Sequence, residues 1–199
     1  MRRAIDFTTG VLALAVLSPL LAIIALGVAI DSPGNPFYGG WRVGQGGRNF
    51  RMWKFRTMVQ GAGKMSPITG GKDPRITRVG RFLRKTKLDE LPQFLNVVLG
   101  DMTLVGPRPE DPEMVALYTP AQRAVLAVKP GVTGRVQLNS GDESAAIPEG
   151  VAPHEYYLQY LMERKIREDL DYLSARTPLS DARIVFETAT FVLRSLAGK

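Results

Sequence analysis

The chain has 199 residues, enough for one compact domain with an appendage, and it contains no cysteine, which excludes a disulfide framework and a thiolate site. Its formal net charge of +7 is unevenly distributed: residues 1–109 carry 16 Lys and Arg against 6 Asp and Glu, whereas residues 110–199 carry 10 against 13. A basic field confined to one half of a chain suits a phosphate-bearing partner, which would be nucleic acid, anionic lipid or a phosphorylated substrate.

The first predicted element is a membrane helix. Residues 10–30 carry no charged side chain, and a helix needs about 20 apolar residues to cross the hydrocarbon core of a bilayer. The apolar run is long for a cleaved signal peptide, and Ile30-Asp31 lacks a small-residue cleavage pattern. We therefore expect residues 1–31 to form a membrane segment and residues 32–199 to form a cytoplasmic domain.

The middle of this run contains Ser18 and Pro19. Proline removes a backbone hydrogen bond and bends a helix, and a serine hydroxyl can satisfy the freed carbonyl. Arg2 and Arg3 precede the run, and five Lys and Arg side chains follow it between residues 42 and 56. Positive charge is retained on the cytoplasmic side of a membrane, so both flanks belong there. A re-entrant helix that bends at Ser18-Pro19 and returns to the same face satisfies both flanks, and a plain kinked span is the alternative.

A turn-rich linker and a β-hairpin are expected next. Residues 31–40 read DSPGNPFYGG, and the segments WRV (41–43) and RNFRMWKF (48–55) flank a Gly-Gln-Gly-Gly turn. Short aromatic and β-branched runs around such a turn are typical of a hairpin. No Gly-Lys-Ser/Thr closes the pattern, so the glycines do not predict a P-loop.

Residues 76–88 predict a basic amphipathic helix. Ile76, Val79, Phe82 and Leu83 have helical spacing, and basic side chains occupy most of the other positions. Such a helix suits the surface of an anionic membrane, and it equally suits a place on the domain core with its basic face in solvent.

The remaining chain predicts mostly helices joined by loops. We expect a helix over 89–99 with Asp89 as its N-cap and Gly100 at its end, and further helices over 119–128, 153–173 and 181–196. The connections are a mobile loop over 60–74, a Pro-rich segment over 100–113, a turn and a short extended piece over 129–138, and an exposed loop over 139–153. The predicted fold class is α+β and mostly helical, with a re-entrant membrane helix, amphipathic interfacial helices and a small β-hairpin.

Carboxylates and cations are the side chains that remain for chemistry. The one histidine, His154, has a loop-like context, no His/Cys cluster has zinc spacing, and there is no Gly-x-Ser-x-Gly motif. The adjacent acids Asp89 and Glu90 would not share a helix face, but at a helix start they can converge on one metal or phosphate. Magnesium prefers one or two carboxylates with phosphate oxygens, and an aspartate can itself form an acyl-phosphate. The alternative is an N-cap and a first-turn acid that complement the helix dipole.

Arg108 lies in the segment Gly-Pro-Arg-Pro, between two prolines. A guanidinium on such a stiff backbone suits bidentate phosphate binding. A salt bridge across a loop is the alternative.

Four segments occur in an order that is typical of one family. They are KFRTM (54–58), DPRITRVGRFLRKTKLDELPQ (73–93), NVVLGDMTLVGPRPE (96–110) and PGVTG (130–134). Together they resemble the monotopic bacterial phosphoglycosyl transferases, the bacterial sugar transferase family, from the N-terminal helix to the last helix. The short chain resembles the minimal form of the family, which lacks the additional N-terminal membrane helices of larger relatives.

This resemblance implies an enzyme that moves a sugar-1-phosphate from a UDP-sugar to a polyprenyl (undecaprenyl) phosphate and releases UMP, as the first membrane step of glycan assembly. It implies a site at the cytoplasmic face of the bacterial inner membrane, with Mg²⁺ as cofactor. Asp89 would be the nucleophile that takes the phosphosugar as a covalent intermediate, and Glu90 the neighbouring acid that binds the metal.

The same resemblance extends to the cations and to the helix break. The matching motifs contain four cations that would bind phosphates, Lys54, Arg56, Arg84 and Arg108, and Ser18-Pro19 matches the break in the family's re-entrant helix. One segment departs from the pattern: relatives continue after PGVTG with Gln-Val-x-Gly-Arg and a Trp-containing stretch, whereas residues 135–150 read RVQLNSGDESAAIPEG. This segment would shape the sugar or nucleotide pocket.

Two other functions fit the composition alone. A membrane-surface adaptor could bind anionic lipid through the basic half, but it would not need the DELPQ and GPRP segments. A membrane-tethered nucleic-acid binder is disfavoured because the basic segments lack aromatic residues arranged as a stacking surface, so we expect no nucleic acid partner.

Overall fold

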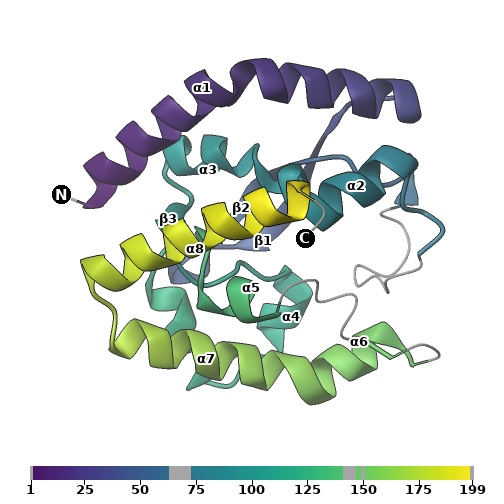
Figure 1. Ribbon diagram of the computed structural model, residues 1–199. Coiled ribbons are helices and arrows are strands. Elements are labelled where there is room, and N and C mark those ends of the chain that lie inside the picture. Colours follow the sequence, from purple (N-terminus) through teal and green to yellow (C-terminus); the bar gives the residue numbers. More distant parts are fainter. Residues whose placement is uncertain (1, 63–72, 141–146, 149–150, 198–199) are drawn as a thin grey trace.

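The computed structural model describes residues 2–62, 73–140, 147–148 and 151–197. Helices dominate, and the strands form two small two-stranded sheets, which confirms the predicted α+β class (Figure 1). In chain order the elements are α1 (Arg2–Asp31), β1 (Phe37–Val43), β2 (Asn49–Phe55), α2 (Arg78–Thr86), α3 (Gln93–Leu99), β3 (Thr103–Val105), α4 (Pro112–Ala116), β4 (Gly131–Thr133), α5 (Arg135–Ser140), α6 (Pro153–Tyr156), α7 (Met162–Ser174) and α8 (Pro178–Leu196).

The apolar N-terminal run folds into α1, a continuous helix of 30 residues. Pro19 lies inside it, and Ser18 Oγ donates a hydrogen bond to Ala15 O at 2.8 Å. The helix axis changes direction along its length as it passes over the domain (Figure 1). Ser18 and Pro19 therefore lie in a bent but unbroken helix.

Both ends of α1 contact the same domain. Near its start, Arg3 Nη1 donates to Val97 O at 2.5 Å, and Asp6 Oδ2 accepts from Thr103 Oγ1 at 2.8 Å. At its end, Asp31 Oδ2 accepts from the Val79 backbone N–H at 2.8 Å. The helix therefore lies along the domain over its length, and neither end extends away from it.

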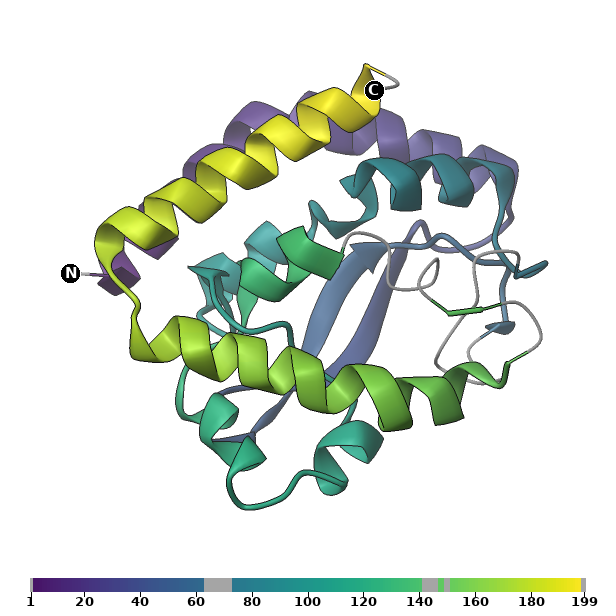
Figure 2. The same cartoon turned by 60° about the horizontal axis from the view of Figure 1, so that its bottom comes forward.

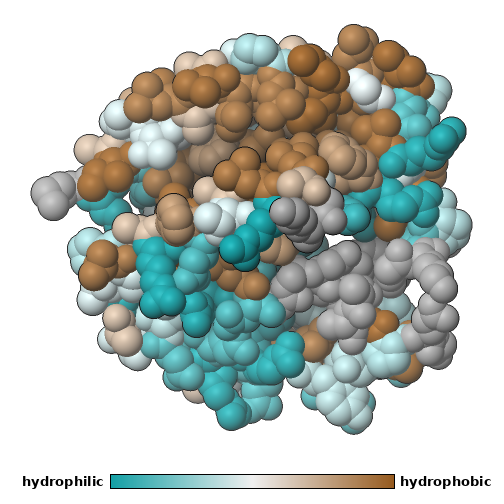
Figure 3. All heavy atoms as spheres, viewed as in Figure 1, coloured by the Kyte–Doolittle hydropathy of each residue, from teal (hydrophilic) through white to brown (hydrophobic). Residues whose placement is uncertain are grey.

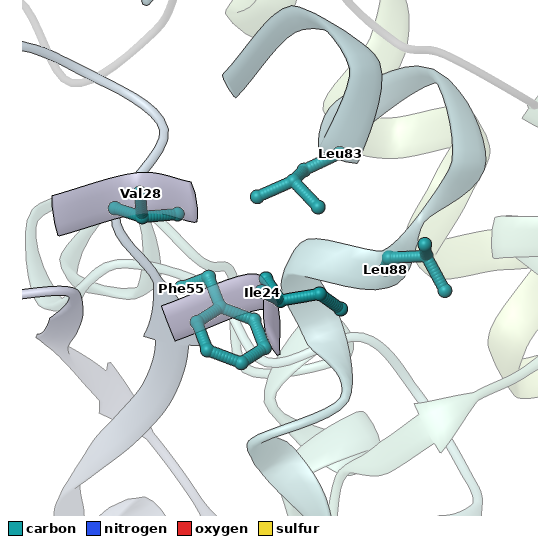
Figure 4. Packing of buried hydrophobic residues seen from close by; sticks show 5 residues of the cluster. All are labelled: Ile24, Val28, Phe55, Leu83 and Leu88. Carbon is teal, nitrogen blue, oxygen red and sulfur yellow. The ribbon is translucent and has the colours of Figure 1, made fainter. Parts of the chain in front are cut away.

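The C-terminal half of α1 closes a hydrophobic cluster. Ile24 and Val28 pack with Phe55 of β2, Leu83 of α2 and Leu88 (Figure 4). On the outward side α1 leaves large apolar side chains exposed, among them Leu12, Val16, Ile23, Leu26 and Ile30. Figure 3 shows hydrophobic atoms gathered over α1 at the top of the view, whereas the lower part is largely hydrophilic.

The predicted hairpin is confirmed. Strands β1 and β2 pair antiparallel from Phe37↔Phe55 to Val43↔Asn49, so β1 begins earlier than the WRV segment. Gly46 (φ 68°) and Gly47 (φ 78°) in the turn adopt left-handed conformations, which glycine reaches without steric cost.

The basic helix is also confirmed, as α2. Its N-cap Thr77 accepts a hydrogen bond from Gly80 N at 3.0 Å. One side packs on the domain through Leu83, which is 1% exposed, while Phe82 is 53% exposed. The interpretation as a core-packed helix is therefore confirmed, and a membrane-facing role for its outer side stays a prediction.

The prediction that Asp89 caps a helix is wrong. Lys87 ends α2 with a left-handed conformation (φ 58°), and Leu88–Glu90 form a separate 3₁₀ turn. The next helix, α3, starts only at Gln93, with Pro92 in the capping position. Leu91 and Pro92 keep helical backbone angles, but Pro92 has no N–H to donate to the Leu88 carbonyl, which separates the 3₁₀ turn from α3. The predicted end of this helix at Gly100 (φ 94°) is confirmed.

The second sheet was not predicted. Strands β3 and β4 pair in parallel, Thr103 with Gly131 and Val105 with Thr133, inside segments expected to be connections. A Cβ at Gly131 would lie 2.1 Å from Gly106 N, so this close backbone approach requires glycine. The range 129–138, expected to form a turn and a short extended piece, contains the strand β4 and then the start of the helix α5.

The C-terminal part is helical as expected, with different details. α6, a π-helical turn (Tyr157–Leu161) and α7 follow one another directly in one long helical run (Figure 2). The last helix, expected from residue 181, begins earlier, at Pro178, and its N-cap Thr177 accepts a hydrogen bond from Ser180 N at 3.1 Å. The expected helix over 119–128 is a 3₁₀ helix (Gln122–Ala127), and the loops predicted over 60–74 and 139–153 lie largely outside the described residues.

Candidate active site

A cavity of about 600 Å³ lies between the hairpin, the end of α2, the Leu88–Glu90 turn and the Pro-rich segment before α4. Elements from both halves of the chain line it, and Val132 and Thr133 of β4 are among the lining residues. All six side chains that the sequence selected for chemistry line this one cavity: Asp89, Glu90, Lys54, Arg56, Arg84 and Arg108.

Glu90 is the centre of a charged triad. Its Oε1 lies 2.8 Å from Lys54 Nζ and 3.0 Å from Arg108 Nη2. Burial alone would raise the pKa of Glu90, but Arg108 and Lys54 hold it well below its ordinary value. Glu90 is therefore an ionised carboxylate, and Arg108 makes the salt bridge across a loop that was the alternative to phosphate binding.

Asp89 differs from its neighbour. It is 7% exposed, and its buried Oδ1 has no hydrogen-bond partner in the part of the chain that the structure describes. Burial raises the pKa of Asp89, and the charge of Glu90 adds to this, while Lys54, Lys87 and Arg84 oppose it. An unpaired buried carboxylate oxygen is costly, so it suits a site that a ligand completes.

The 3₁₀ turn explains why the two acids differ. It follows directly on Lys87, whose left-handed backbone ends α2 and turns the chain toward the cavity. Adjacent residues of a tight turn point in different directions. Glu90 consequently meets the cations of β2 and the Pro-rich segment, while Asp89 keeps one oxygen without a partner.

The other two cations selected from the sequence, Arg84 and Arg56, lie at the same cavity. Arg84, in the last turn of α2, donates from Nε to Thr57 Oγ1 at 2.9 Å. Arg56 donates to Pro33 O at 2.7 Å and to Ser32 O at 2.5 Å, so its guanidinium holds the segment that follows α1. Phosphate binding by Arg56 stays a prediction, and this geometry gives it a structural task as well.

The residues present fit a magnesium ion only together with a substrate. No group of three or more His, Cys, Asp and Glu side chains with metal-binding geometry occurs within the described ranges. Asp89 has a free buried oxygen beside an ionised Glu90, and Mg²⁺ is commonly held by one or two carboxylates plus substrate phosphates. Magnesium at this pair stays a prediction.

A second polar cluster lies behind the Pro-rich segment, and sequence reasoning missed it. Lys165 Nζ lies 2.9 Å from Glu110 Oε1 and 3.1 Å from Tyr157 Oη. Burial raises the pKa of Asp169 to about 7, against the opposing effects of the Lys165 charge and of the Arg108 backbone N–H. Lys165 and Asp169 are four residues apart in a charged helix, a spacing that ordinarily indicates a solvent-exposed pair.

Comparison with known proteins gives a consistent result. The sequence model of the family described as bacterial sugar transferase matches residues 1–195. The chain is 37% identical to the UDP-glucose:undecaprenyl-phosphate glucose-1-phosphate transferase of Escherichia coli over 94% of its own length, and 35% identical to the transferase of the same name from Caulobacter vibrioides over 96%. It is 33% identical over its whole length to a UDP-N-acetylgalactosamine-undecaprenyl-phosphate N-acetylgalactosaminephosphotransferase from Aeromonas hydrophila.

These relatives differ from the chain in length. The chain spans 39% of the Escherichia coli relative, 45% of the Aeromonas hydrophila relative and 69% of the Caulobacter vibrioides relative. The matched part includes the cavity with Asp89 and Glu90, because the family match runs from the start of α1 into α8.

Proposed function

The chain belongs to the bacterial sugar transferase family, and from that membership we propose that it transfers a sugar-1-phosphate from a UDP-sugar to undecaprenyl phosphate and releases UMP. The names of the relatives support the acceptor, because they describe transfer to undecaprenyl phosphate. Glucose and N-acetylgalactosamine, which those names give as the sugar, are the first donors to test.

One observation carries the proposal: a buried aspartate with a free oxygen lies in a cavity rich in cations. Asp89 attacks the phosphorus that bears the sugar, the bond to the UMP oxygen breaks, and UMP leaves with the electron pair. An oxygen of undecaprenyl phosphate then attacks the same phosphorus and releases the Asp89 carboxylate. A covalent intermediate splits the transfer into two steps, so donor and acceptor need not be bound together.

The neighbours of Asp89 support this chemistry. Lys54 and Arg84 lie close enough to lower the pKa of Asp89 against the effect of burial, which favours the ionised nucleophile. Glu90, fixed by Lys54 and Arg108, would hold Mg²⁺ together with phosphate oxygens of the substrate. The ion would neutralise negative charge that develops on the departing phosphate.

The arrangement of α1 supports a re-entrant helix at the cytoplasmic face of the inner membrane. Both ends of α1 bind the domain through polar side chains, Arg3 and Asp6 at one end and Asp31 at the other. A helix that crossed the bilayer would place one of its ends on the far side of the hydrocarbon core, out of contact with the domain. With its ends on one domain and its apolar side outward, α1 enters and leaves the membrane on the same side, where UDP-sugars are dissolved.

A labelling experiment tests the chemistry. Protein incubated with UDP-sugar labelled in the sugar, with Mg²⁺ and without acceptor, should acquire covalent label and release UMP. Asp89→Asn should acquire none, whereas Asp171→Asn, at an exposed position of α7, should label as the wild type does. Full labelling of Asp89→Asn would remove Asp89 from the role of nucleophile.

A cysteine experiment tests the topology. The chain has no cysteine, so Ala4→Cys at the start of α1 and Asn49→Cys in the hairpin each introduce a single thiol at an exposed position. Both should react with an impermeant reagent only from the cytoplasmic face. Reaction of Ala4→Cys from outside intact cells would show a spanning helix instead.

A further inference from the structure

Two further acids, Glu110 and Asp111, line the active-site cavity, and the chemistry above uses neither; Asp111 forms a salt bridge with Arg42. Glu110 follows Arg108 by two residues in the same Pro-rich segment, and its side chain is 17% exposed. Residues two apart lie within about 7 Å along an extended chain, so Glu110 is a near neighbour of the arginine that contacts Glu90. A sugar ring can bridge a separation of this size between Arg108 and Glu110.

One oxygen of Glu110 is held firmly. Glu110 Oε1 accepts hydrogen bonds from Lys165 Nζ at 2.9 Å and from Tyr157 Oη. The Lys165 side chain is 7% exposed, and its Nζ lies 4.8 Å from the centroid of the Tyr157 ring. Lysine is rarely this buried unless it is paired, so the two residues fix the orientation of the carboxylate and balance its charge.

The other oxygen is different. Within the described ranges, no hydrogen bond reaches Glu110 Oε2, while the residue lines the cavity together with Asp89 and Arg108. A carboxylate oxygen repels phosphate, so it does not belong to the phosphate-binding part of the cavity. It accepts hydrogen bonds only, and the most numerous donors of a UDP-sugar are the hydroxyl groups of its sugar and its ribose, beside the uracil N3–H and the N–H of an acetamido group.

We propose that Glu110 Oε2 accepts hydrogen bonds from hydroxyl groups of the UDP-sugar, and that Lys165 and Tyr157 are the positioning residues that aim it. The inference rests on the proposed function and adds a substrate-binding residue to it. The hydroxyl groups belong either to the transferred sugar or to the ribose, and these two sources can be separated by experiment.

The test compares wild type and Glu110→Gln with a set of donors. The donors are the UDP-sugar that releases UMP fastest among UDP-glucose, UDP-galactose and UDP-N-acetylgalactosamine, its analogues lacking one sugar hydroxyl, and its 2′-deoxy and 3′-deoxy ribose analogues. With the complete donor, Glu110→Gln should lower kcat/KM about 10- to 100-fold, the range expected for a hydrogen bond to a charged group. With the analogue that lacks the bound hydroxyl, the two proteins should have equal kcat/KM. A sugar analogue with this behaviour identifies the sugar as the source, and a ribose analogue identifies the ribose.

Three comparisons keep the result interpretable. Glu163→Gln replaces an exposed acid of α7 that pairs with Arg167, and it should leave kcat/KM unchanged for every donor. Glu110→Asp keeps a negative charge beside Lys165, so it should unfold like the wild type. Its shorter side chain withdraws the free carboxylate oxygen from the cavity, so its kcat/KM values across the donors should resemble those of Glu110→Gln. Equal losses of kcat/KM for Glu110→Gln with every analogue, or no loss at all, would overturn the inference. Wild-type protein that releases UMP from no donor would overturn the proposed function itself.

Discussion

Replacement of Gly80 by alanine is expected to damage catalysis although Gly80 does not line the cavity. A Cβ at this position would lie 2.1 Å from Thr57 O, 2.7 Å from Thr57 C and 2.8 Å from Thr57 Cα. All three are backbone atoms, and ordinary contact begins at 3.4 Å, so α2 and Thr57 must separate by about 1.3 Å. Excess volume in a tightly packed site costs about 1–3 kcal/mol of folding free energy.

The displacement reaches the acids through α2. Arg84 in this helix donates to Thr57 Oγ1, and Lys87 at its end leads directly into the turn that carries Asp89. A misplacement of about 1 Å in a catalytic site costs about 100-fold in rate. We therefore expect kcat of Gly80→Ala to fall about 100-fold.

The assay is UMP release at saturating donor, together with the midpoint of urea unfolding. The matched control is Gly27→Ala in α1, because a Cβ there meets no atom within 4 Å. The control should keep the wild-type rate. If Gly80→Ala also keeps the wild-type rate and unfolding midpoint, the reasoning that α2 must touch the Thr57 backbone is refuted.

Three further predictions follow from burial. Burial raises the folded-state pKa of Asp169 from 3.8 to about 7, so the stability that this group contributes is lost as the pH rises through 7. Asp169→Asn should therefore have a higher thermal unfolding midpoint than the wild type at pH 8 and nearly the same midpoint at pH 4. An equal difference at both pH values would contradict the assignment. Burial also raises the pKa of Asp89, and the ionised form attacks, so the pH profile of kcat/KM for UMP release should have an acid limb whose apparent pKa lies above the ordinary value of 3.8. An apparent pKa at or below 3.8 would show that Asp89 is not desolvated in the working enzyme. Leu83→Ala should lower the free energy of unfolding by about 2–5 kcal/mol in urea titration, because Leu83 is fully enclosed between α1, α2 and β2.

Local signals explain what the sequence could predict. The hairpin follows from a glycine turn between two β-prone runs, and α2 follows from apolar spacing at Val79, Phe82 and Leu83. The six candidate side chains were chosen from motifs, and the fold brings them to one cavity. The acid pair was harder to place, because a carboxylate just before a predicted helix can be either its N-cap or a site residue. The structure decides between them, because α3 starts only at Gln93, after Pro92.

Other features depend on contacts that no local pattern contains. Strands β3 and β4 have three residues each, too few for an alternating pattern, and their pairing depends on the approach of Gly131 to Gly106. Lys165 and Asp169 look like a solvated pair, and they are buried only because the Pro-rich segment lies across α7. Polar residues of this kind can be recognised only after the tertiary structure covers them.

The π-helical turn at Tyr157–Leu161 decides whether Tyr157 and Lys165 share one face of their helix. A π turn joins residues five apart instead of four, so it contains one residue more than the α-helical turn it replaces. Tyr157 lies at its start and Lys165 beyond its end, and both reach the same oxygen of Glu110. On a regular α-helix, residues eight apart point about 80° apart around the axis, and the extra residue of the π turn brings Tyr157 and Lys165 onto one face. Conversion of the turn to α-helical geometry without the loss of a residue would therefore separate the two side chains and remodel a wall of the cavity.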